Sequence, residues 1–172
     1  MTLPRRAPVL GVIGPGDEAS ESEVAAAFEI GALAASAGWV VLTGGRAVGV
    51  MDAASRGARS AGGIAVGVLP DGDVARASRA LDIAIATALG EMRDHVVVLS
   101  SDAIVVCGMN PGTAAETALA VKARKPLILL RPTEVARAFF QTLTDRGVDE
   151  AATAAEAMSL VTASLSAEGP AS

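Results

Sequence analysis

The sequence predicts a Rossmann-like α/β fold, in which a doubly wound and mainly parallel sheet is flanked by helices. Short runs of Val, Ile and Leu alternate with segments of helical spacing, and glycine-rich loops follow several of the expected strands. Apolar residues make up 51% of the chain but aromatic residues only 2%. A core of aliphatic side chains suits a parallel sheet that is buried on both faces. With 172 residues, the chain is expected to form a single ligand-binding domain spanning residues 1–172.

In the first half of the chain, three apolar runs alternate with two helical segments. Ser20 or Ser22 can cap the start of the first helix, and Gly38 is placed to end it. The second helix begins near Val50 and ends before a glycine pair at 62–63. We therefore expect strands at 9–13, 39–43 and 64–69, joined by helices at about 20–37 and 50–61.

The second half of the chain continues this alternation. A polar, turn-forming segment at 70–80 predicts a mobile loop near the site, and residues 81–85 predict a short strand. The remaining segments predict helices at 91–100, 112–122, 133–146 and 150–165, strands at 103–106 and 126–130, and a frayed tail at about 168–172. Because the connections are short, these strands favour one parallel sheet.

The composition excludes several classes of function. The formal net charge is −5 and the basic residues are scattered, which is not the pattern of a nucleic-acid-binding protein. One cysteine and one histidine leave too few ligands for a disulfide framework or a catalytic metal site. No apolar run approaches the roughly 18 residues of a membrane span, and the amino-terminal segment does not resemble a signal peptide. We expect a cytoplasmic protein without membrane or nucleic-acid partners.

The first glycine-rich loop is Gly14-Pro15-Gly16, directly after the first strand. Together with Asp17-Glu18-Ala19 it matches the dinucleotide fingerprint G-x-G-x-x-G/A superficially. Two acidic residues occupy the position of a pyrophosphate, and no acidic residue ends the second strand to bind a ribose. The Gly-Lys-Ser/Thr sequence of a Walker P-loop is absent. We expect Gly14 and Gly16 to approach a ligand, but we do not expect NAD.

The second loop runs from Thr43 to Met51 and follows the second strand. Its three glycines, Gly44, Gly45 and Gly49, are more than an ordinary strand-to-helix turn needs. They let a ligand approach the backbone at the start of a helix, where free N–H groups favour an anion. The candidate ligand-binding residues of this loop are Thr43, Gly44, Gly45, Arg46, Gly49 and Met51.

The third loop, residues 107–111, lies between a buried strand and a helix. Its backbone and the positive end of the helix dipole form a natural site for a phosphate. Thr113 and Glu116 have the spacing of a capping box, and from spacing alone this structural interpretation is favoured. In the alternative, functional interpretation, both side chains bind a ligand. Because ligands of doubly wound sheets bind at the carboxyl ends of the strands, we expect the three loops to line one crevice. The candidate ligand-binding residues of the third loop are Gly108, Met109, Asn110, Gly112 and Thr113.

Two further residues allow a structural or a functional interpretation. Arg93 is either a solvated arginine, paired with Glu91 or Asp94 on an exposed face, or a site residue. Cys107 ends a buried strand and is interpreted as a small core residue rather than a nucleophile, because no basic partner is evident.

Taken together, the loops resemble the LOG family, a group of Rossmann-like proteins long described as possible lysine decarboxylases. The family's GG-x-x-G-(L/V)-M loop corresponds to residues 44–51, with one residue more between the glycines, and its P-G-G-x-G-T-x-x-E loop corresponds to residues 108–116. The family's arginine maps onto Arg93. The resemblance covers about residues 9–130 and is closest to the branch that includes the molybdenum cofactor carrier proteins, which has Arg-Asn where this chain has Arg93-Asp94.

The resemblance implies two functions, and the sequence leaves both open. The carriers bind a pterin cofactor through its phosphate and are homo-oligomers, which implies molybdenum cofactor as bound cargo and a dimer or tetramer. The LOG enzymes hydrolyse the N-glycosidic bond of nucleoside 5′-monophosphates, which implies catalytic roles for Arg93 and Glu116. Both functions imply a small phosphorylated ligand.

The third loop differs from the family pattern, because Gly108-Met109-Asn110 replaces Pro-Gly-Gly. Two side chains stand where glycines let backbone amides surround a phosphate. Asn110 offers a side-chain donor in exchange, whereas Met109 is expected to narrow the approach.

Overall fold

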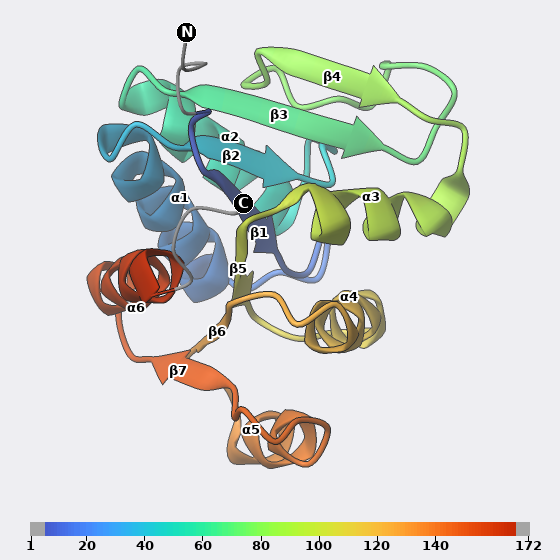
Figure 1. Ribbon diagram of the computed structural model, residues 1–172. Coiled ribbons are helices and arrows are strands. Elements are labelled where there is room, and N and C mark those ends of the chain that lie inside the picture. Colours follow the sequence, from blue (N-terminus) through green and yellow to red (C-terminus); the bar gives the residue numbers. More distant parts are fainter. Residues whose placement is uncertain (1–5, 168–172) are drawn as a thin grey trace, which may run out of the picture.

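In the computed structural model, which describes residues 6–167, seven parallel strands form one sheet in the order β4-β3-β2-β1-β5-β6-β7. Figure 1 shows helices on both faces of this sheet: α1, α2 and α6 cover one hydrophobic cluster, and α3, α4 and α5 cover the other. The Rossmann-like α/β fold is therefore confirmed. The tail expected at 168–172 lies outside the described residues.

The strands are β1 (Val9–Ile13), β2 (Val40–Thr43), β3 (Ile64–Leu69), β4 (Ile83–Ala86), β5 (Ala103–Cys107), β6 (Leu127–Leu130) and β7 (Asp149–Ala151). The helices are α1 (Glu21–Ser36), α2 (Gly49–Ser60), η1 (Gly90–Met92), α3 (Arg93–Ser100), α4 (Pro111–Lys122), α5 (Glu134–Gln141) and α6 (Ala154–Ala167).

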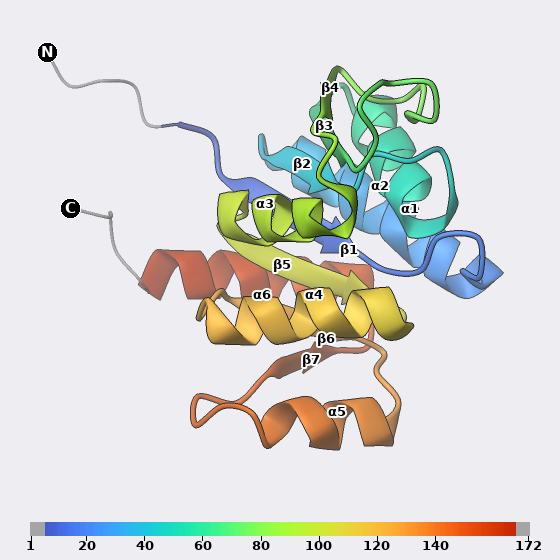
Figure 2. The same ribbon diagram turned by 90° about the vertical axis from the view of Figure 1, so that its right-hand side faces the viewer.

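The strand order reverses at β1, which pairs with β2 on one side and with β5 on the other. Gly11 lies opposite Leu42 of β2 and opposite Ile104 of β5. The carboxyl ends of β2, β1 and β5 are therefore neighbours, and the three glycine-rich loops follow these ends. In Figure 2 the arrowheads of β1 and β5 point to the side at which α4 begins. The sheet thus brings the loops to its topological switch point, where ligands of such sheets bind.

The ends of the first two helices agree with the sequence prediction. The Ser20 hydroxyl accepts from the Glu23 N–H at 3.3 Å, and the Glu23 carboxylate accepts from the Ser20 N–H at 2.8 Å, which together form a capping box. Gly38 and Gly62 follow α1 and α2 at φ +78° and +72°, a conformation that favours glycine. Within residues 6–167, no helix is both long and apolar enough to cross a membrane.

Helix α5 is shorter than expected, because the helix predicted at 133–146 ends at Gln141. The Thr142 hydroxyl donates to the Phe139 carbonyl oxygen at 2.6 Å, and Gly147 then turns the chain at φ +75°. These local contacts end the helix although its apolar spacing continues.

Strand β7 has no counterpart among the expected strands. Its residues pair with β6 at the edge of the sheet, with Asp149 opposite Ile128. The helix expected at 150–165 therefore begins only at Ala154. An Asp-Glu-Ala sequence has low strand propensity, so pairing with β6 rather than local preference forms this strand. The short strand expected at 81–85 lies slightly later, at Ile83–Ala86.

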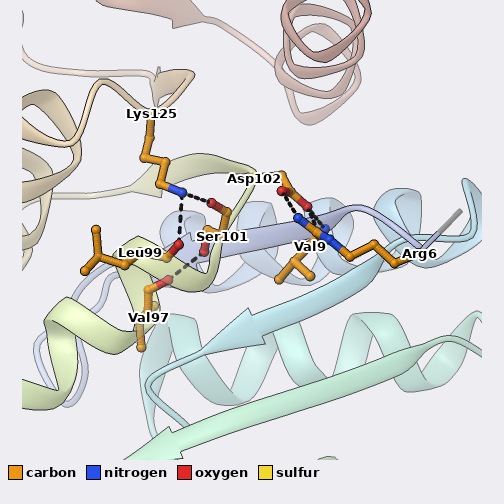
Figure 3. A network of polar contacts seen from close by, with 7 residues as sticks. All are labelled: Arg6, Val9, Val97, Leu99, Ser101, Asp102 and Lys125. Carbon is orange, nitrogen blue, oxygen red and sulfur yellow. Dashed lines mark hydrogen bonds and ion pairs between the residues drawn. The ribbon is translucent and has the colours of Figure 1, made fainter. Parts of the chain in front are cut away.

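A polar network joins segments at the amino-terminal side of the sheet, away from the glycine-rich loops (Figure 3). The Asp102 carboxylate accepts from the Val9 N–H at 2.8 Å and from the Arg6 guanidinium at 2.6 and 2.7 Å. Burial opposes the charge of Asp102, but these hydrogen bonds hold its pKa below the ordinary value. The Lys125 ammonium donates to the carbonyl oxygens of Leu99 and Ser101 at 2.9 and 2.6 Å, which ties the α4–β6 connection to the turn before β5.

Candidate functional site

Gly14 and Gly49 allow the first and second loops to pack closely together. A Cβ on Gly14 would lie 2.8 Å from a Val50 methyl group and would overlap with the backbone of β5. A Cβ on Gly49, which has φ +51°, would overlap with the carbonyl oxygens of Pro15 and Gly16. The Val50 N–H donates to the Pro15 carbonyl oxygen at 3.1 Å, so the first loop itself satisfies one free donor at the start of α2.

Gly44 lies directly against the Arg93 side chain. A Cβ on Gly44 would overlap with the Arg93 guanidinium and would lie 2.7 Å from the Met51 sulfur. The Met51 methyl group also reaches toward Gly16, where an added Cβ would lie 3.6 Å away. The fold therefore brings residues of the first and second loops to Arg93.

Among the other residues of the second loop, Thr43 bonds within the loop, whereas Gly45 and Arg46 contact the β3–β4 connection. The Thr43 hydroxyl is buried and accepts from the Gly45 N–H at 3.1 Å. The Arg46 guanidinium lies 3.3 Å from the Asp71 carboxylate. The β3–β4 connection, for which the sequence predicts mobility, is hydrogen-bonded to this loop, with the Ser78 N–H 2.8 Å from the Gly45 carbonyl oxygen.

Asn110, and not Thr113, caps helix α4. The Asn110 side-chain oxygen accepts from the Thr113 N–H at 2.8 Å, and Pro111 occupies the first helical position. The prediction of a capping box between Thr113 and Glu116 is therefore wrong, because the helix already begins at Pro111. Proline has no N–H and the Thr113 N–H is already paired, so within this first turn Gly112 offers an N–H that has no acceptor among the described residues.

Met109 and Gly108 occupy the side of the third loop that faces β6 and α1. Met109 packs against the hydrophobic cluster under α3, α4 and α5, and it lines a cavity of about 140 Å³ together with Leu129 and Pro132. Gly108, at φ +89°, lies against the Glu23 side chain at the start of α1. Met109 therefore contributes apolar packing on this side of the loop, and its effect on the approach of a ligand stays a prediction.

Arg93, Asp94 and Glu116 form a charged cluster between α3 and α4. Arg93 Nη1 lies 2.7 Å from Asp94 Oδ1 and 3.6 Å from Glu116 Oε1. The three side chains are 14%, 16% and 10% exposed, so the interpretation of Arg93 as a solvated surface residue is wrong, although its pairing with Asp94 is confirmed. Among residues 6–167, no acceptor reaches the buried Arg93 Nε.

This cluster places two carboxyl groups and one guanidinium in a setting with little water. Burial and the nearby Asp94 charge raise the pKa of Glu116 to about 8, and Arg93 opposes this effect only in part. Burial also raises the pKa of Asp94, against the attraction of Arg93. Glu116 is therefore mainly protonated at neutral pH and is able to donate a hydrogen bond.

Of two further residues near this site, the sequence predicts the place of Cys107 but not that of Asp94. Cys107 is a core residue as expected, 1% exposed, and burial raises the pKa of its thiol to about 12. Asp94 belongs to the cluster although no motif selects it. Its only indication in the sequence is its position next to Arg93.

Comparisons with known proteins agree with this architecture. The SLOG cluster4 family matches residues 7–158. The molybdenum cofactor binding protein of Rippkaea orientalis is 42% identical in sequence and has a TM-score of 0.91, over 93% of this chain and 98% of that one. The molybdenum cofactor carrier protein of Chlamydomonas reinhardtii is 46% identical and has a TM-score of 0.89, over 94% of this chain and 99% of that one. A protein of Archaeoglobus fulgidus is 40% identical over 128 residues, which is 72% of this chain and 80% of its own length. The chain therefore belongs to the SLOG cluster4 family.

Proposed function

We propose that this protein binds and carries a small phosphate-bearing heterocyclic molecule at the glycine-rich loops. The observation that carries this proposal is the position of the Arg93 guanidinium, which lies against Gly44. Its buried Nε–H has no hydrogen-bond acceptor among the described residues. A buried donor without a partner is costly, and native proteins rarely leave one unsatisfied. An acceptor atom of a bound ligand is a suitable partner for this N–H.

The charges around Arg93 suit an anionic group. Asp94 balances the charge of Arg93, and protonated Glu116 adds no negative charge that would repel a phosphate. The start of α4 adds the free Gly112 N–H and the positive end of the helix dipole. We propose that the ligand contacts Gly16, Gly44, Met51, Arg93, Gly112 and Thr113.

Molybdenum cofactor is the candidate cargo. The support for it comes from the Rippkaea orientalis and Chlamydomonas reinhardtii proteins, which share 42% and 46% identity with this chain over more than nine-tenths of its length. The orphaned Arg93 donor and the start of α4 suit the phosphate of such a cofactor.

The protonation of Glu116 favours a second candidate function, hydrolysis of the N-glycosidic bond of a nucleoside 5′-monophosphate. A carboxylic acid with a pKa of about 8 can protonate a leaving base and, once ionised, can stabilise an oxocarbenium-like sugar. Incubation with adenosine 5′-monophosphate tests this candidate. Release of adenine by the unmodified protein, abolished in Glu116→Gln, would support it, and no release would exclude this substrate.

We further propose that the protein is a homo-oligomer, either a dimer or a tetramer. Large apolar side chains are exposed on β4 and next to Arg93, with Ile83 at 51%, Ile85 at 44% and Met92 at 68% exposed. Exposed apolar patches often mark interfaces. Light scattering coupled to size-exclusion chromatography tests this proposal, which predicts that Met92→Glu lowers the mass of the assembly.

Equilibrium binding of purified molybdenum cofactor tests the carrier function. We expect saturable binding by the unmodified protein and about tenfold weaker binding by Arg93→Ala, because hydrogen bonds to a charged group contribute about 1.5–3 kcal/mol. Circular dichroism of the variant shows whether the fold is retained. An affinity of the unmodified protein no higher than that of an unrelated α/β protein would contradict the proposal.

A further inference from the structure

We propose that Asp94 is a positioning residue of this site: it pairs with the Arg93 guanidinium and, together with the burial of Glu116, favours a neutral Glu116 carboxylic acid that donates a hydrogen bond to the ligand. This inference rests on the proposed function only for the identity of the ligand. The protonation of Glu116 itself is a property of the protein alone.

The first argument is the geometry of one nitrogen atom. Arg93 Nη1 is the atom that approaches both carboxylates, and it lies 2.7 Å from Asp94 Oδ1 but 3.6 Å from Glu116 Oε1. The shorter contact is an ion pair, because no described residue donates a hydrogen bond to Asp94 Oδ1, and electrostatic attraction weakens with distance. Asp94 therefore interacts more strongly with Arg93 than Glu116 does, and the attraction between Arg93 and Glu116 is the weaker of the two.

The second argument concerns the other surroundings of Glu116. Arg93 and Asp94, both on α3, are the charged groups that act on it among the described residues. The strands behind α4 have only apolar or thiol side chains, Ala-Ile-Val-Val-Cys in β5 and Leu-Ile-Leu-Leu in β6. The Glu116 side chain is only 10% exposed, so water does little to stabilise its charged form. Burial is thus the first cause of the raised pKa of Glu116, and the Asp94 charge adds to it against the attraction of Arg93.

The neutral state of Glu116 has a direct consequence for binding. With Glu116 protonated, the three side chains carry no net charge, and the acid offers its O–H to a phosphate oxygen. Ionisation of Glu116 removes this donor and gives the cluster a net charge of −1. The affinity for an anionic ligand is therefore expected to fall as the pH rises through about 8, the pKa of Glu116.

Replacement of Asp94 by Asn separates this role from a purely structural one. Asn has nearly the same size but no charge, so Arg93 becomes available to Glu116 and the repulsion from Asp94 disappears. We expect Glu116 to titrate at a clearly lower pH in Asp94→Asn. Asp149→Asn, which removes an exposed carboxylate at the β7 edge of the sheet, is the matched control and should leave the titration in place.

Carbon-13 NMR of protein labelled at the glutamate carboxyl carbon measures this titration without any ligand. The resonance of Glu116 is identified by its loss in Glu116→Gln. We expect a midpoint near pH 8 in the unmodified protein and a midpoint at least about one pH unit lower in Asp94→Asn. A midpoint in the ordinary range of glutamate, or one that Asp94→Asn does not move, would overturn the inference.

A binding measurement then tests the donor role. With purified molybdenum cofactor as the probe, Glu116→Gln should bind more tightly than the unmodified protein at about pH 9, because the amide still donates when the acid has ionised. Equal or weaker binding by Glu116→Gln at that pH would overturn the donor role. Failure of every form to bind the cofactor would contradict the carrier function, while the NMR titration would still decide the role of Asp94.

Discussion

Gly44 and Arg93 are in such close contact that a single methyl group on Gly44 would overlap with the Arg93 guanidinium. Gly44 directly follows β2, which lies between β1 and β3 in the sheet, and Arg93 begins α3, more than forty residues later in the sequence. The contact places the cation of the site under the second glycine-rich loop. It explains why this loop needs a glycine here although its backbone does not have a left-handed conformation at this position.

Gly44→Ala is expected to weaken ligand binding without unfolding the protein. The added methyl group meets the far end of the Arg93 side chain and the Met51 sulfur rather than backbone atoms, so we expect these side chains to move and the backbone to stay in place. We expect about a tenfold or larger loss of affinity for molybdenum cofactor, since displacement of one charged hydrogen-bond donor has this scale. Gly72→Ala is the control, because its Cβ would meet only the Ala88 methyl group at 3.6 Å. Equal affinities of the two variants would contradict the role of Gly44.

Asn110→Ala is expected to lower the free energy of unfolding by about 1 kcal/mol, because it removes the cap of α4. Asn110→Asp retains a side-chain acceptor for the Thr113 N–H and should cost much less. Urea unfolding followed by circular dichroism measures both. If the two variants are equally unstable, the cap is not the reason for the loss.

Glu116→Gln is expected to make stability less dependent on pH. The folded protein holds a proton on Glu116 between its ordinary pKa of about 4.5 and about 8, whereas the unfolded chain has released it. Because the folded state binds more protons in this range, the stability of the unmodified protein falls as pH rises from about 4.5 to 8. Each pH unit within this range lowers the free energy of unfolding by at most about 1.4 kcal/mol. Urea unfolding near both limits should show that Glu116→Gln gains stability relative to the unmodified protein at the higher pH. A constant difference between the two proteins would contradict the raised pKa.

Asp102→Ala is expected to destabilise the amino-terminal side of the sheet by about 1–3 kcal/mol, because it leaves the Val9 N–H without its acceptor. Arg6→Ala should cost only about 0–1 kcal/mol, since the Arg6 side chain is 70% exposed. The pKa of Asp102 is lowered in the folded state, so its contribution is present at neutral pH and is lost as the pH falls through that pKa. Thermal unfolding at neutral and acidic pH measures these differences, and a larger loss for Arg6→Ala would contradict this order.

The sequence predicts most of the fold because the core strands carry their own indications. Apolar runs between Gly, Pro and polar residues identify β1 to β3, β5 and β6, and the capping box at Ser20 locates α1. β7 could not be predicted in this way, because its Asp-Glu-Ala sequence is a strand only through its pairing with β6. The end of helix α5 could not be predicted from apolar spacing either, because it depends on the hydrogen bond from the Thr142 hydroxyl to the Phe139 carbonyl oxygen.

The site was predictable in outline but not in its chemistry. The positions of the loops in the sequence place Gly44 and Glu116 near the carboxyl ends of neighbouring strands of the sheet. Spacing alone could not distinguish a Thr113 cap from an Asn110 cap, because both residue types cap helices well. The burial of Arg93, and its unequal distances to the Asp94 and Glu116 carboxylates, depend on how α3 packs on α4. No local sequence pattern reports this packing.

The most direct test of the central claim is native mass spectrometry of the protein purified from its own host, followed by denaturation and identification of any released molecule. We predict a released molybdopterin species from an oligomeric protein, and less of it from Gly44→Ala. Release of a nucleotide or free base instead would contradict the carrier function and favour the hydrolase.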